Sequence, residues 1–98
     1  MAKKIRIGLN AFAVGLKPGR MVPEIKRIEV VQKGQVAQRY LDEPSEQFWY
    51  VKGLFESGTS DIAESKIHLE LDDARKELRR RCLSQIQAYV EAMEESER

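Results

Sequence analysis

Residues 67–93, IHLELDDARKELRRRCLSQIQAYVEAM, decide the fold of this chain. Their first five positions alternate apolar and polar side chains, a period of two that predicts a short strand with one buried face. From Leu71 onward the apolar residues recur at steps of three and four, which predicts an amphipathic helix over about residues 71–94. This apolar stripe consists of Leu71, Ala74, Leu78, Cys82, Ile86, Tyr89 and Met93. The chain is therefore expected to end in a strand that leads directly into a long helix.

The charged residues of this helix agree with its predicted direction. Asp72 and Asp73 fall in the first turn, where acidic side chains suit the positive end of the helix dipole. Glu77 and Arg81 are four residues apart, as are Asp72 and Lys76, so both pairs are predicted to form ion pairs along the helix.

The apolar face of the helix is wider than one packing partner needs. Leu83 and Val90 lie beside the stripe and extend it on one flank. A homodimer through the C-terminal helix is therefore one hypothesis for this surface.

Upstream of residue 67 the pattern predicts short strands. Apolar residues alternate over residues 5–9 and change parity from Phe12 onward, so a strand with a bulge or break near residues 8–10 is expected. The sequence KPGR at residues 17–20 predicts a turn. Two further strands are expected over residues 25–31 and 36–41, with Lys33 and Gly34 as their hairpin turn.

Two polar stretches and one aromatic stretch complete the expected order of elements. Residues 42–46 and 57–61 are rich in turn-forming side chains and are predicted to be loops. Residues 48–51, FWYV, are apolar on both parities, which predicts a central strand.

These elements predict an α+β fold. About five short strands between residues 4 and 71 would form a small curled antiparallel sheet, an SH3-like barrel, and the helix would cap it. A chain of 98 residues is expected to be a single domain, residues 1–98.

The composition favours a soluble protein of a reducing compartment. Hydrophobic residues make up 42% and charged residues 34% of the chain, which is typical of a folded domain with a well-solvated surface. Cys82 is the only cysteine, so no internal disulfide can form. No apolar run is long enough for a membrane span, and no signal-peptide core is present. A cytoplasmic protein without membrane contact is expected.

The segment 64–74, ESKIHLELDDA, resembles the corresponding part of small SH3-like barrel proteins from bacteriophages and mobile elements. In those proteins a short strand likewise runs into a helix that begins with paired acids and an alanine. The resemblance covers about half of the chain. It implies the barrel fold and a phage or mobile-element origin, where such small accessory proteins often dock on a host protein, among them anti-CRISPR-like inhibitors of host defence.

The sequence predicts no metal, cofactor or catalytic residue. His68 and Cys82 are too few for a structural zinc site, which takes four nitrogen or sulfur ligands. His68 is expected on the surface, and Cys82 is expected to be a small core residue. The carboxylates near the helix start are interpreted as capping and solvating groups rather than as an acid–base pair. They are Asp61, Glu64, Asp72 and Asp73.

The favoured hypothesis is a non-enzymatic binding module that docks on a host protein and inhibits or redirects it. Aromatic and arginine side chains dominate protein interfaces. The residues predicted for this contact are Phe48, Trp49, Tyr50, Arg75, Arg79 and Arg80. For Trp49 a second position stays open, beneath the terminal helix.

The alternative hypothesis is a nucleic-acid-binding barrel. The net charge is only +1, with 17 basic and 16 acidic residues, but the basic residues are concentrated before residue 40 and in the helix. The residues predicted to contact a phosphate backbone are Lys3, Lys4, Arg6, Lys76, Arg80 and Arg81.

Overall fold

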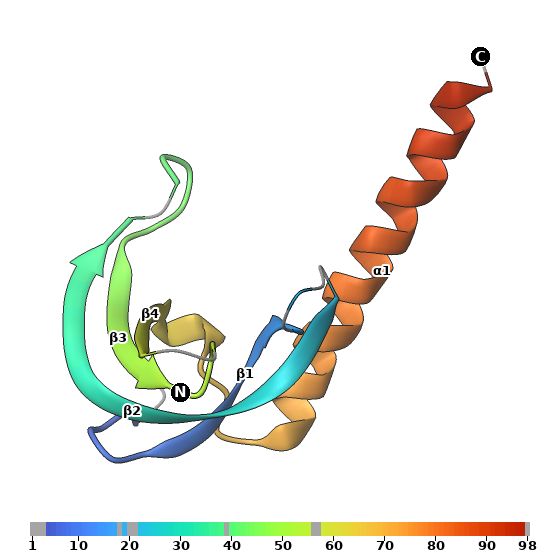
Figure 1. Ribbon diagram of the computed structural model, residues 1–98. Helices are drawn as coiled ribbons and strands as arrows, with labels where there is room; N and C mark the ends of the chain where they lie inside the picture. Colours follow the sequence, from blue (N-terminus) through green and yellow to red (C-terminus); the bar gives the residue numbers. More distant parts are fainter. Residues whose placement is uncertain (1–3, 18, 20–21, 39, 56–57, 98) are drawn as a thin grey trace.

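The structure is a computed structural model that describes residues 4–17, 19, 22–38, 40–55 and 58–97 (Figure 1). Along the chain it forms β1 (Asn10–Leu16), β2 (Pro23–Ala37), β3 (Glu46–Lys52), β4 (Thr59–Ala63), a 3₁₀ helix η1 (Glu64–Lys66) and α1 (Leu71–Ser96). The four strands form one open antiparallel sheet in the order β1-β2-β3-β4. The predicted α+β class is confirmed, whereas the predicted barrel of five strands is not.

The long strand β2 determines the shape of the sheet. Its residues 23–29 pair with β1, and its residues 29–37 pair with β3, so the two pairings meet at Glu29. The register shifts between Val30 and Gln32 and again between Lys33 and Val36. Such bulges bend a strand and increase its twist. Figure 1 shows β2 as one strongly curved ribbon that carries the sheet from β3 round to α1.

Gly34 lies in this strand, so the predicted hairpin turn at Lys33 and Gly34 is wrong. The Gly34 carbonyl accepts a hydrogen bond of 2.8 Å from Nε2 of Gln47 on β3. A Cβ atom on Gly34 would lie only 2.9 Å from the Phe48 carbonyl oxygen. Glycine is therefore needed here because β2 and β3 approach closely. In the sequence alone, such a glycine resembles the glycine of a turn. The connection between β2 and β3 instead spans residues 38–45, of which Arg39 lies outside the described residues.

The predicted strand at the N-terminus is also corrected. Residues 4–9 form no strand, because Ile7 and Gly8 make a turn, and β1 begins only at Asn10. The Gly8 amide donates to the Val30 carbonyl at 2.7 Å, and the Val30 amide donates to the Leu9 carbonyl at 2.9 Å. The expected break near residues 8–10 is therefore confirmed. Of the predicted turn at 17–20, Pro18 and Arg20 lie outside the described residues.

Two expectations near the end of the sheet are wrong. Thr59–Ala63 forms β4 where a loop was predicted over 57–61, because pairing with β3 outweighs the polar side chains of this segment. The strand predicted for residues 67–71 is reduced to a single antiparallel bridge between His68 and Phe12. Their two amides donate to each other's carbonyls at 2.8 Å.

The hydrophobic core lies on one face of the bent sheet. Alternate residues of each strand point to it, as the pleat of a strand requires. The core consists of Ala11, Ala13, Ile28, Val30, Trp49, Val51, Leu54, Ile62 and Ile67. Ile5 and Leu9 pack against its margin.

Helix α1 covers β1 and the adjoining part of β2 with its first half only. Ala74 and Glu77 are its buried residues, and all residues from Ile86 to Glu97 are exposed. Figure 1 accordingly shows the second half of α1 projecting away from the sheet. The predicted helix of residues 71–94 is confirmed and extends to Ser96. Neither helical segment of the described chain has the apolar length that crossing a membrane requires.

Gly53 provides a test of the bent sheet. Its φ is +95°, and a Cβ atom there would collide with the Arg27 carbonyl oxygen of β2. We expect Gly53→Ala to lower the free energy of unfolding by about 2 kcal/mol or more, measured by urea denaturation.

Gly8→Ala is the matched control, because Gly8 has a φ of +89° but open space around its Cβ position. Gly8→Ala should lower the free energy of unfolding only by the cost of a left-handed backbone conformation, about 1 kcal/mol. Equal losses in the two variants would show that the contact between Gly53 and β2 is not close.

Candidate functional site

A buried carboxylate lies where α1 meets the sheet. Glu77 is 3% exposed. Its Oε1 lies 2.6 Å from Nε2 of His68, and its Oε2 lies 2.6 Å from Nη2 of Arg81. Oε2 accepts no hydrogen bond of good geometry from the described residues. Its negative charge is instead balanced by the ion pair with Arg81. A buried carboxylate is tolerated only with partners of this kind.

Local sequence explains how these three side chains meet. Glu77 and Arg81 are one helical turn apart on the face of α1 that looks toward the sheet, and the ion pair predicted for them is confirmed. His68 is fixed against β1 by its bridge to Phe12. Nη1 of Arg81 reaches the Val14 carbonyl of β1 at 3.4 Å. We call His68, Glu77 and Arg81 the ionic clamp, because they tie the helix to the first strand.

The clamp corrects the expectation that His68 is on the surface. His68 is buried, since its single bridge to β1 turns the ring under the helix instead of outward. Cys82, expected in the core, is only partly buried. Within the described ranges no three His, Cys, Asp or Glu side chains are grouped so that they could hold a metal ion.

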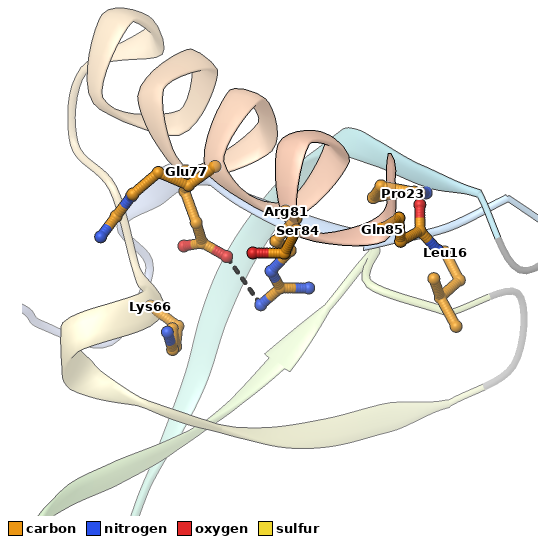
Figure 2. A pocket seen from close by; sticks show the side chains of 8 residues that line it. Leu16, Pro23, Lys66, Glu77, Arg81, Ser84 and Gln85 are labelled. Carbon is orange, nitrogen blue, oxygen red and sulfur yellow. Dashed lines mark ion pairs between the residues drawn. The ribbon is translucent and has the colours of Figure 1, made fainter. Parts of the chain in front are cut away.

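Two adjoining hollows open beside the clamp. The first, which we call the helix hollow, has a volume of about 370 Å³ and lies between α1 and the facing ends of β1 and β2. Figure 2 shows Glu77, Arg81, Ser84 and Gln85 on its helix side and Lys66 on the opposite side. Its other lining residues are Leu16, Pro23 and Arg80.

The second, the strand hollow, has a volume of about 480 Å³. Its lining residues are Val14, Tyr50, Leu54, Phe55, Thr59, Ser60, Asp61, Ile62, Ala63, Lys66 and Arg81. Lys66 and Arg81 line both hollows, so the two adjoin at these side chains. We call the combined surface the groove. It has an aromatic end, formed by Tyr50 and Phe55, and a basic middle.

The aromatic run of β3 is only partly available for a partner. Phe48 and Trp49 are buried, so the prediction that they form an exposed contact is corrected. Trp49 packs in the core, and its Nε1 donates to Oε1 of Glu64 in η1 at 3.2 Å. Its ring is thus covered by η1 and the sheet core rather than lying free on the surface. Tyr50 has the opposite parity, is 37% exposed and lines the strand hollow.

The arginines predicted for a protein contact lie on the outer side of α1. Arg75, Arg79 and Arg80 are all exposed, and Arg80 also borders the helix hollow. Asp72 pairs with Arg75 at 3.4 Å, not with Lys76 as predicted. Both side chains of this pair are largely exposed, so the pair adds little stability.

The residues predicted to bind nucleic acid lie on two separate segments, the N-terminal residues and α1. Lys4 and Arg6 are exposed on the N-terminal segment and line neither hollow, while Lys3 lies outside the described residues. Lys76 and Arg80 are exposed on α1, but Arg81 is engaged by Glu77.

Comparison with known proteins assigns no family to the chain. No protein-family model matches it, and no curated protein or solved structure shows significant similarity to it.

Sequence reasoning missed several groove residues. Phe55 and Lys66 come from short connections that carry no motif, and they meet Arg81 only through the folding of β4 and η1. The i,i+4 spacing of Glu77 and Arg81 was the one usable signal, but it gave no indication that the pair is buried.

Because Glu77 joins both partners of the ionic clamp, we expect its replacement to destabilise the protein. Replacing its charge by an amide in Glu77→Gln removes the ion pair with Arg81 while keeping the shape of the side chain. We expect the free energy of unfolding to fall by about 1–3 kcal/mol, measured by urea denaturation.

Glu91→Gln is the matched control on the same helix. Glu91 is exposed and accepts a hydrogen bond of 3.2 Å from Gln87, so its replacement should change stability by less than about 0.5 kcal/mol. Similar effects at the two positions would contradict a stabilising role for the buried pair.

Proposed function

We propose that this protein is a non-enzymatic binding module that docks on a host protein through the groove and inhibits or redirects it. The observation that supports this most is the position of exposed aromatic side chains next to cationic ones. Tyr50 and Phe55 are 37% and 53% exposed at one end of the groove, and Lys66 and Arg81 line its middle. Aromatic and arginine side chains together are the usual anchors of protein interfaces.

The contacts of Arg81 favour a role in binding a partner. Its guanidinium is held by Glu77 and by the Val14 carbonyl, so little side-chain entropy remains to be lost when a partner binds. Lys66 is exposed on the other side of the same space and adds a second cation (Figure 2). A partner segment with an apolar side chain followed by a carboxylate would fit the two parts of the groove.

The contacts within the ionic clamp favour a structural role for His68 and Glu77. Both polar atoms of Glu77 face groups that attach α1 to β1, namely His68 and Arg81. In this proposal these side chains hold the groove in shape, and no bond is made or broken in a bound molecule.

The proposal extends to the type of barrel and to its origin. We infer that the sheet is an incomplete form of the SH3-like barrel found in small phage and mobile-element proteins, including anti-CRISPR-like inhibitors of host defence. Two features support this inference: the strong curvature of β2, and the Phe12–His68 bridge, which lies on the free edge of β1 where a fifth strand would pair.

The groove can be tested by capture from bacterial lysates with tagged protein. We expect the chain to retain a stoichiometric protein partner after nuclease treatment, and Phe55→Ala to weaken this binding by about 30-fold, as expected for an interface hot spot. Phe55 is largely exposed, so its replacement should leave the fold intact.

Tyr40→Ala is the control for this variant. Tyr40 is similarly exposed but lies in the loop of residues 38–45 and lines neither hollow. Its replacement should leave capture unchanged. Partners that disappear after nuclease treatment, with binding that falls steeply and log-linearly as salt rises, would replace this proposal by the nucleic-acid alternative.

A further inference from the structure

The projecting half of α1 carries an apolar surface that no part of the described chain covers. We call Leu83, Ile86, Val90 and Met93 the seam. Together with Tyr89 beside them, these side chains are between 41% and 64% exposed. Their spacing of three, four and three residues is that of the a and d positions of a coiled coil.

The seam is not a continuation of the face that packs on the sheet. Residues of an α-helix are about 100° apart around its axis, so the middle of the seam lies roughly 165° from the direction of Ala74, Glu77 and Arg81. The ionic clamp fixes the latter face against β1. The sheet of the same molecule therefore cannot cover the seam.

We propose that the seam is the interface of an antiparallel homodimer, in which the α1 helices of two copies pair around a two-fold axis near residue 88. In this register Leu83 lies opposite Met93 of the second copy, and Ile86 lies opposite Val90. Each contact occurs twice, as the symmetry of such an interface requires. This inference concerns the outer side of α1 and does not rest on the proposed function of the groove.

The charges on either side of the seam favour a second copy as the occupant. Basic residues precede the seam and acidic residues follow it on the same side of the helix. The antiparallel register places Arg79 opposite Glu97 and Arg80 opposite Glu94 of the other copy. Parallel helices would instead bring like charges together at both ends, which disfavours that arrangement.

The shape of the molecule permits this pairing. The C-terminal half of α1 projects beyond the sheet, so the two sheets would lie at opposite ends of the paired helices (Figure 1). The overlap of residues 79–97 is roughly 28 Å long at 1.5 Å per residue. All seam residues are exposed in the single chain, so replacing them should not affect its folding.

The dimer can be tested by sedimentation equilibrium of the full chain. We expect a concentration-dependent dimer, and we expect Ile86→Glu to weaken dimerisation by about tenfold or more while the far-ultraviolet circular dichroism keeps its helical signal. Ala88→Glu, an exposed change of the same charge off the seam, should leave the dimer intact. A wild-type chain that remains monomeric at every concentration overturns the proposal, as does a dimer indifferent to Ile86→Glu.

A charge exchange tests the antiparallel register. Arg80→Glu and Glu94→Arg should each weaken the dimer, and the double variant should restore it, because each new glutamate again faces a new arginine. A double variant no tighter than the single ones would overturn the antiparallel arrangement.

Discussion

The buried carboxylate of Glu77 is the constraint on which the rest of the structure depends. Ala74 and Glu77 are the only buried residues of helix α1. Apolar contact alone therefore does little to fix the direction in which the helix lies on the sheet. A carboxylate removed from water must instead keep its two partners, His68 from the segment before the helix and Arg81 from its next turn. Since His68 is bonded to β1 through Phe12, satisfying Glu77 fixes the helix to the first strand.

Two surfaces follow from this attachment. On the inner side, the clamp holds Arg81 between the helix hollow and the strand hollow, where it meets Lys66 and the exposed aromatic residues of the groove. On the outer side, the fixed rotation of α1 turns the seam away from the sheet. A protein that pairs through the seam would present two grooves, one at each end of the joined helices, and could bind a partner twice.

The sequence predicts those features that depend on local pattern. The 3.6-residue period identifies α1, the apolar run FWYV identifies β3, and the parity change after residue 9 identifies the break before β1. The errors share a different cause: contacts between distant residues. Gly34 is a place of close approach to β3, β4 forms because β3 offers it a partner, and His68 is buried by one bridge to Phe12. The groove is harder still to predict from the sequence, because its residues come from four separate segments. They are Tyr50, Phe55, Lys66 and Arg81. Only the fold brings them together.

A double-mutant cycle on His68 and Glu77 tests most directly whether the clamp attaches the helix. The free energies of unfolding of the wild type, His68→Ala, Glu77→Ala and the double variant would be compared by urea denaturation. If the two side chains act together, the double variant should be more stable than the sum of the single losses implies, with a coupling energy of about 1 kcal/mol or more. Additive losses, with a coupling energy near zero, would contradict the account.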